Sequence, residues 1–229
     1  MPAFDTMPHA SRSSRQLILL ALLLGSLPIV AININYLLAA SEGHVPWCVP
    51  YWDSCTSISA TGRAGTAFFF FKATMLPLAL VYFLYWRHAN RHLSKLGYKG
   101  RTIEILGLVA VVGLACYILA LGAVGDNFRL TRRIGIILYF GLTYLCQLLI
   151  VYRLDTLKVP DPTKIWQQRL LGLILLIGLA TLVLDLALSN YDDYENAFEW
   201  NIGLLVHFNF LIAAYGWHKS QQKMVSSHQ

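Results

Sequence analysis

Charged side chains are scarce in this chain, and their scarcity argues against a soluble fold. Asp, Glu, Lys and Arg make up 13% of the 229 residues, whereas hydrophobic residues make up 56%. A soluble domain carries about 25% charged residues. The longest polar stretch lies between the first two hydrophobic runs, so we expect one membrane domain over residues 1–229 and no separate soluble domain.

The chain also lacks the short motifs of several enzyme classes. It has no G-x-S-x-G or H-E-x-x-H sequence, no Gly-rich phosphate loop, and no group of three histidines with an aspartate. These absences argue against elbow-type serine hydrolases, zinc peptidases and P-loop proteins. Helices interrupted at matching positions in two halves, which mark many transporters, are not evident either.

What the chain has in quantity is long hydrophobic runs. Each run of about 20 residues is long enough to cross a hydrocarbon core of roughly 30 Å. The runs are Leu17–Leu38, Thr66–Trp86, Ile103–Val124, Ile134–Tyr152, Leu170–Leu188 and Ala197–Trp217. The first exceeds the ~7–15 residues of a signal peptide, so we expect it to remain as a helix. The predicted fold class is an all-α, six-transmembrane-helix bundle.

The basic residues predict the orientation of this bundle. Most of the 18 Lys and Arg flank the same alternate helix ends, in the two tails and in the loops after the second and fourth runs. By the positive-inside rule, both termini are therefore cytoplasmic, with tails at about 1–16 and 218–229. The same rule explains the net charge of +6 without nucleic acid as a partner.

The first loop, at about residues 39–65, then faces the non-cytoplasmic side. It contains the stretch PWCVPYWDSCTSISATGR, in which Cys48 and Cys55 are seven residues apart. On an oxidising side these cysteines can form a disulfide, with free thiols as the alternative. A metal is disfavoured because His44 is the only nearby imidazole and four ligands are the norm.

Ionisable residues inside the runs are candidate site residues, because they are costly in a membrane. Lys72 either extends to the interface or pairs with Asp185 or Glu199. His207 is either a hydrogen-bonded packing residue or, with Glu199, a weak candidate for a catalytic base. A cluster of Arg129, Arg132 and Arg133 lies on the side that should be poor in basic residues, and it needs an acidic loop or an anionic ligand as its partner.

Three short motifs resemble the Frag/DRAM/Sfk family of six-helix membrane proteins. One is SISATGR at residues 57–63, directly before an aromatic-rich second run. Another is the Glu199–Trp200 pair at the start of the sixth run. The fourth run is similar to the family's G…F…Y-x-x-Q…Y pattern, which is carried here by Gly135, Phe140, Tyr144, Gln147 and Tyr152. The chain departs from the family before the fourth run, where arginines stand in place of a common histidine.

The resemblance implies a role with lipid on the non-cytoplasmic side, since the family includes proteins of GPI-anchor lipid remodelling, lysosomal autophagy and plasma-membrane lipid organisation. We therefore expect a protein that binds or organises lipid there, in a bacterial inner membrane or a eukaryotic endomembrane. A lipid-remodelling enzyme of the acyl-transfer type is the alternative, and a transporter is a second one. No cofactor or metal is expected, and a homo-oligomer or a membrane-protein partner is left open.

The expected headgroup site combines the basic cluster with the first loop and the ionisable residues near it. Arginine supplies donors shaped for phosphate, and loop aromatics anchor among headgroups. The site residues are Arg129, Arg132, Arg133, Lys72, Asp185, Glu199 and Trp52.

The orientation and the disulfide can be tested together by thiol labelling of intact cells. A membrane-impermeant maleimide is expected to label Cys48 and Cys55 only after reduction, because the bridge blocks them and their side is accessible. A Cys48→Ser, Cys55→Ser double variant is the unlabelled control. Labelling without reductant would contradict the bridge, and labelling of a Ser227→Cys variant in intact cells would contradict the orientation.

Overall fold

The predicted hydrophobic runs all form helices in the computed structural model. The structure describes the backbone of residues 7–226 and the side chains of residues 14–191 and 193–222. This part of the chain contains eight helices and no strand: α1 Met7–Ser41, α2 Pro50–Asp53, α3 Ile58–Thr61, α4 Gly65–Lys95, α5 Thr102–Ala120, α6 Asp126–Thr156, α7 Lys164–Ala187 and α8 Asp192–Ser226. The predicted all-α class is confirmed.

Six of these helices are long and apolar enough to span a membrane. They are α1, α4, α5, α6, α7 and α8, each with a mean hydropathy of at least 1.3 over its most apolar part. Their positions match the six predicted runs, so the chain is a multi-pass helical membrane protein. Helices α1 and α8 continue into the two predicted tails, where Arg12 and Lys223 lie outside the described side chains.

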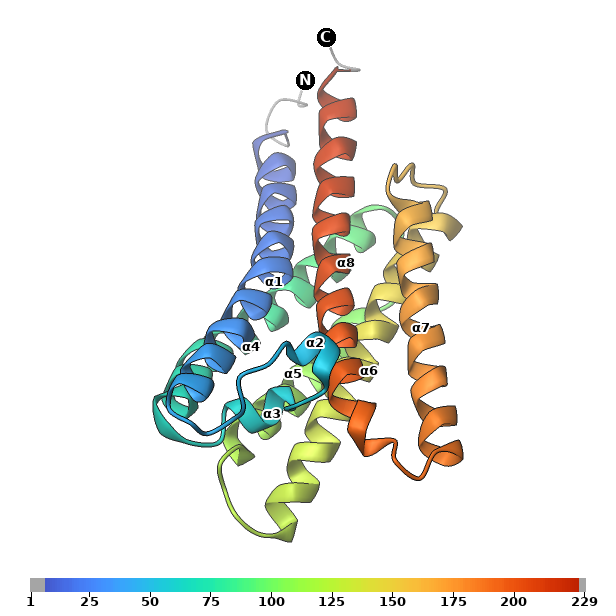
Figure 1. Ribbon diagram of the computed structural model, residues 1–229. Helices are drawn as coiled ribbons and strands as arrows, with labels where there is room; N and C mark the ends of the chain where they lie inside the picture. Colours follow the sequence, from blue (N-terminus) through green and yellow to red (C-terminus); the bar gives the residue numbers. More distant parts are fainter. Residues whose placement is uncertain (1–6, 227–229) are drawn as a thin grey trace, which may run out of the picture.

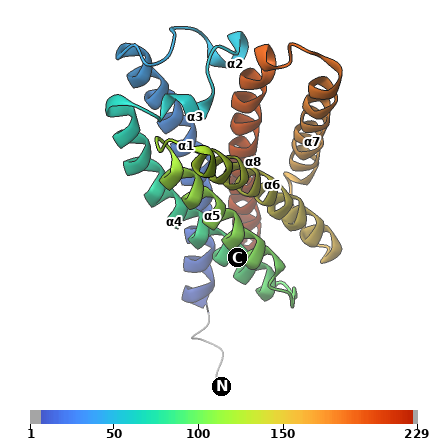
Figure 2. The same ribbon diagram turned by 90° about the horizontal axis from the view of Figure 1, so that it is seen from below.

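The six long helices form a bundle in chain order, with α1 closing the ring against α8. Helix α1 packs between α4 and α8, α5 packs between α4 and α6, and α7 packs mainly on α8 (Figures 1 and 2). The start of α1 and the end of α8 lie at the same end of the bundle, called here the terminal end. The short helices α2 and α3 lie at the opposite end, called here the loop end.

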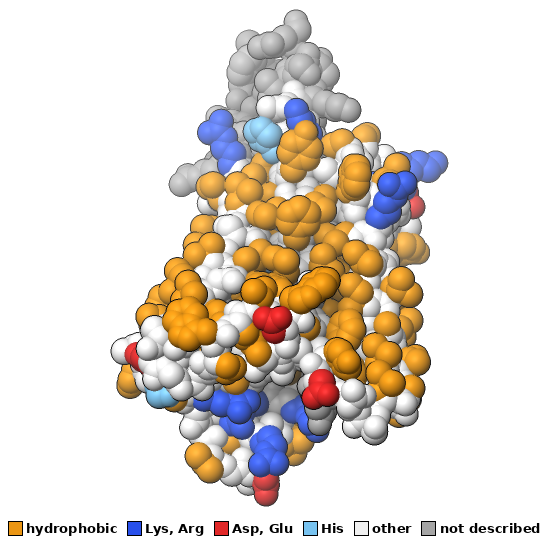
Figure 3. All heavy atoms as spheres, viewed as in Figure 1, with side chains coloured by type: hydrophobic (Ala, Val, Ile, Leu, Met, Phe, Trp, Pro, Cys, Tyr) orange, Lys and Arg blue, Asp and Glu red, His pale blue; other side chains and the backbone are white. Residues whose placement is uncertain are grey.

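Hydrophobic side chains cover the outside of the bundle as well as its core. Figure 3 shows a broad hydrophobic surface between basic groups at the two ends. The core is aromatic, and its largest fully buried side chains include Tyr82, Tyr85, Trp86, Trp200 and Phe210. This distribution suits a bilayer, in which exposed apolar surface costs nothing and backbone groups must bond within their own helices.

Two glycines allow α5 and α6 to approach each other closely. A Cβ atom on Gly113 would lie 2.9 Å from the carbonyl oxygen of Gly135, and one on Gly135 would lie 2.6 Å from that of Gly113. Small residues at such crossings let membrane helices gain packing contacts that lipid does not offer. This pair therefore sets the spacing of α5 and α6.

Adding one methyl group at this crossing tests the packing. Gly135→Ala is expected to lower the stability by about 1–3 kcal/mol, because the obstructing atom is backbone and the helices must separate. The control is Gly141→Ala in the same helix, where the new Cβ meets open space. Thermal unfolding in detergent measures both variants. A Gly135→Ala protein that melts at or above the wild-type temperature would contradict the close crossing.

Candidate functional site

The segment between α1 and α4 is folded back over the loop end and is closed by the Cys48–Cys55 disulfide. The predicted bridge is thus confirmed. The hydroxyl of Tyr36 in α1 accepts a hydrogen bond from the Cys48 amide at 2.7 Å and donates to the Cys48 carbonyl at 2.8 Å. One cysteine is therefore fixed to α1. The predicted anchor Trp52 is 86% exposed on α2.

The start of α8 holds the other half of this segment. The buried Trp200 indole donates to the Thr56 carbonyl at 2.8 Å, and the Asn201 amide donates to the Tyr51 carbonyl at 2.8 Å. Carbonyls in an irregular loop need such donors, since they have no helical partners. The segment is thereby fastened to both α1 and α8.

Two serines and an arginine lie in or next to α3 at the loop end: Ser57 precedes the helix, Ser59 lies in it and Arg63 follows it. Ser57 caps the helix by accepting a hydrogen bond from the Ala60 amide at 3.1 Å. Ser59 accepts a hydrogen bond from the Arg63 guanidinium at 2.8 Å. The Glu199 carboxylate of α8 lies near the backbone amides of Ile58 and Ser59. Both serines therefore have structural partners.

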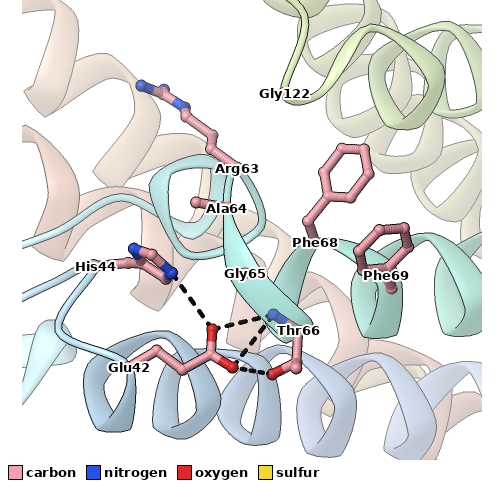
Figure 4. Close-up of a pocket in the computed structure, with 9 residues that line it drawn as sticks. All are labelled: Glu42, His44, Arg63, Ala64, Gly65, Thr66, Phe68, Phe69 and Gly122. Atoms are coloured by element: carbon pink, nitrogen blue, oxygen red, sulfur yellow. Dashed lines mark hydrogen bonds and ion pairs between the residues drawn. The ribbon is translucent and has the colours of Figure 1, made fainter.

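An open groove with a volume of about 570 Å³ lies beside this arrangement, between the end of α1, the start of α4 and the connection from α5 to α6. Figure 4 shows its lining residues, with Arg63 pointing away from Glu42 and the Phe68 ring extending toward Gly122. The groove thus combines charged groups with an aromatic wall.

Glu42 joins the end of α1 to the start of α4 along the rim of the groove. Its carboxylate accepts hydrogen bonds from the Thr66 amide, at 3.0 and 3.2 Å, and from the Thr66 hydroxyl. The Thr66 side-chain hydrogen bond is the main cause that lowers the pKa of Glu42 below its ordinary 4.5. His44 Nε2 lies 3.4 Å from the same carboxylate. Between these residues Gly65 has φ +62°, a conformation that favours glycine.

Two further cations gather where α5 ends, next to the groove. Lys72 Nζ donates to the Leu119 carbonyl at 3.5 Å and lies 4.2 Å from the centre of the Phe68 ring. Arg132 donates to the carbonyls of Ala120 and Ala123 at 3.0 and 2.8 Å. The last carbonyls of a helix lack intrahelical partners and attract cations. Both side chains therefore complete the C-terminal end of α5.

The structure separates residues that the sequence placed together. Lys72 forms no ion pair with Asp185 or Glu199 among the described residues. Asp185 is exposed on α7, which packs on α8 and α6 rather than on α4, and Glu199 faces α3. Arg129 pairs with Asp126 at 3.8 Å on the exposed start of α6, and Arg133 is exposed there. Of the three arginines, only Arg132 turns back onto the bundle.

His207 lies deeper, in a buried network with two tyrosines. Its Nδ1 faces the Gly203 carbonyl, so Nε2 is the acceptor. The Tyr82 hydroxyl lies 2.8 Å from Nε2, and the Tyr139 hydroxyl donates to Tyr82 at 2.7 Å. A small cavity beside this network is lined by His207, Tyr82 and Tyr139 among others, and its lining includes no Ser, Thr, Cys or Lys residue. His207 therefore has hydrogen-bonding partners but no hydroxyl or thiol of a usual nucleophile beside it.

The sequence did not single out Arg63, Tyr82 or Tyr139. Arg63 stands in a loop with no local charge pattern, and tyrosines are common in membrane helices. The one available signal was that Tyr82 and Tyr139 lie at about the depth of His207 in neighbouring helices. Whether their hydroxyls meet His207 depends on the rotation of each helix, which packing sets.

Comparison with protein-family models, with curated proteins and with solved structures gives no match for this chain. The class that the fold defines is a six-span helical membrane protein with a disulfide-closed cap at the loop end. Membership of the Frag/DRAM/Sfk family stays a prediction.

The lowered pKa of Glu42 predicts that its hydrogen bonds to Thr66, which connect α1 to α4, depend on pH. Its contribution to stability is complete above its ordinary pKa of 4.5 and is lost as the pH falls through the lower value of the folded state. Glu42→Gln is therefore expected to lower the melting temperature at neutral pH and to flatten its fall between about pH 5 and pH 3. The exposed Glu195→Gln is the control. Parallel acid profiles for wild type and Glu42→Gln would contradict this role.

Proposed function

We propose that the protein binds membrane lipid at the loop end, on the non-cytoplasmic side, with the headgroup in the groove beside Arg63. The observation that carries this proposal is the groove itself. It has room for a headgroup at about 570 Å³, and it is lined by Arg63, by the Glu42 carboxylate bonded to Thr66, and by the rings of Phe68 and Phe69. A lipid presents the matching combination of phosphate and hydrocarbon.

Arg63 is the group best suited to the phosphate. It is exposed, it lines the groove, and its one hydrogen bond to a side chain is the bond to Ser59. No carboxylate lies within ion-pair distance of Arg63, Lys72 or Arg132 among the described residues. Their charge favours an anionic group nearby, and a guanidinium can bind phosphate through two parallel hydrogen bonds. Figure 3 shows basic side chains gathered at this end.

The aromatic side of the groove leads into the bilayer. Phe69 is 71% exposed on the lipid-facing surface of α4, and Phe68 lies beside it. Acyl chains attached to a headgroup at Arg63 can therefore continue along α4 without leaving hydrocarbon. Trp47 and Trp52, exposed on the cap, are placed to hold this end at the headgroup level.

The acyl-transfer alternative finds less support. Ser57 and Ser59, the hydroxyl candidates of the loop, are used in capping α3 and in binding Arg63. Neither lines the cavity next to His207. A catalytic role for His207 or Glu199 would thus need a nucleophile brought by the substrate, whereas binding needs no further group.

Charge reversal at Arg63 tests the groove. Arg63→Glu is expected to reduce co-purifying phospholipid about tenfold or more, because an attractive contact to phosphate becomes a repulsive one. Native mass spectrometry of the protein released from detergent measures the retained lipid. Arg129→Glu is the matched control, since Arg129 is exposed at the same end but does not line the groove. Equal lipid retention in both variants, at the wild-type level, would refute the proposed site.

A further inference from the structure

A second cavity, with a volume of about 40 Å³, lies inside the bundle beneath α3. Its lining residues come from α1, α3, α4, α5, α6 and α8, and they include Tyr117, Tyr139, Glu199 and His207. A buried water occupies ~10–15 Å³ by this measure, so the cavity holds a group of about three heavy atoms.

The Tyr117 hydroxyl is the first sign that this cavity receives a polar ligand. Tyr117 is 3% exposed, and its hydroxyl is fully buried with no hydrogen-bond partner in the described part of the chain. A buried polar group without a partner is destabilising unless something binds it. Glu199, Arg63 and Arg132 lie near enough to act on this hydroxyl electrostatically. Tyr117 thus stands between the groove cations and the inner cavity.

The Glu199 carboxylate is the second sign, and it specifies the charge of the ligand. It lies near the backbone amides of Ile58 and Ser59, and no basic side chain lies within ion-pair distance among the described residues. A carboxyl group beside an apolar cavity is either protonated or stabilised in its ionised form by a positive partner. A cationic ligand at this cavity therefore stabilises the ionised form of Glu199.

Tyr139 supplies a further acceptor, and its orientation is set by His207. Because Nδ1 of His207 donates to the Gly203 carbonyl, Nε2 must accept from a tyrosine. The Tyr139 hydroxyl hydrogen then points into this network, toward Tyr82 at 2.7 Å and Nε2 at 3.2 Å. The lone pairs of the Tyr139 oxygen remain free to accept. His207 acts here as a positioning residue.

We propose that this cavity binds an organic ammonium group, namely the primary amine of a lipid headgroup whose phosphate lies against Arg63. An ammonium has three N–H donors, and the residues that line the cavity include Glu199, Tyr117 and Tyr139, each of which carries a side-chain oxygen. Aromatic rings, among them Phe71 and Phe140, form much of the remaining wall and favour a cation through their π faces. The inference rests on the proposed function and names its substrate class as amine-bearing phospholipid.

The size of the cavity distinguishes between kinds of ammonium. An aminoethyl group contributes three heavy atoms, which matches the space for about three waters. A trimethylammonium group is larger and has no N–H donor for the three oxygens. The site should therefore accept a primary amine and exclude choline.

The test compares lipids that differ only in the amine. Wild-type protein is delipidated and incubated with phosphatidylethanolamine, its N-acetyl derivative or phosphatidylglycerol, and retention is measured by native mass spectrometry. Phosphatidylethanolamine is expected to be retained about tenfold more than the N-acetyl form, since acetylation removes the charge. Equal retention of these two lipids by the wild-type protein would overturn the ammonium site. This comparison does not depend on the folding of any variant.

Variants then assign the preference to the cavity. Glu199→Gln is expected to abolish the preference for the free amine while phosphatidylglycerol is still retained, and Tyr117→Phe is expected to weaken it several-fold. The control is Asp193→Asn, which removes an exposed acidic group at the start of α8. If both Glu199→Gln and Tyr117→Phe retain the full preference for phosphatidylethanolamine over its N-acetyl form, the inner cavity is not the amine site. If Glu199→Gln does not fold, Tyr117→Phe and the wild-type comparison decide.

Two outcomes separate this inference from the proposed function. Retention of all three lipids alike, with loss in Arg63→Glu, leaves the groove in place and removes the ammonium site. Loss of every lipid in wild type removes both. Soluble ethanolamine tests whether the amine belongs to a lipid. If ethanolamine stabilises the protein but phosphatidylethanolamine is retained no better than its N-acetyl form, the cavity binds an ammonium group that does not come from a lipid.

Discussion

The attachment of the cap to the start of α8 is the interaction on which the rest of the loop end depends. The Trp200 indole donates to the Thr56 carbonyl just before α3, and the Glu199 carboxylate lies near the Ile58 and Ser59 amides of that helix. An irregular segment at a membrane surface needs partners for its backbone groups, and α8 supplies them. The same contacts place Ile58 over the inner cavity and Arg63 beside the groove.

This arrangement gives polar groups inside the bundle two different tasks. The His207, Tyr82 and Tyr139 network joins α8, α4 and α6 with satisfied hydrogen bonds, and such networks hold membrane helices in one relative rotation. The Tyr117 hydroxyl is as deeply buried but has no hydrogen-bond partner in the described part of the chain. The network and Tyr117 line the same cavity.

Particular residues show how far the sequence could predict this site. The Cys48–Cys55 bridge followed from spacing and side, because the two residues are close in the chain. The pairing of Lys72 with an acid did not form, because Lys72 has nearer acceptors at the end of α5 and α7 packs away from α4. The role of Arg132 in binding a ligand stays a prediction, and its guanidinium donates to two carbonyls at the end of α5. Both basic side chains thus bond to backbone carbonyls, which no sequence pattern marks.

The sequence by itself determined that this is a six-span helical membrane protein, since run length and low charge suffice to identify each span. It also favoured the disulfide over free thiols, because the two cysteines are close together in the chain. The tertiary structure decided which polar groups meet. Glu199, Tyr117 and Tyr139 come from three different helices. In α5 and α8 the apolar residues are spread around the whole circumference, so the sequences of these two helices do not specify which face turns inward. Close contacts such as that between Gly113 and Gly135 set those rotations, and they exist only when the helices are packed.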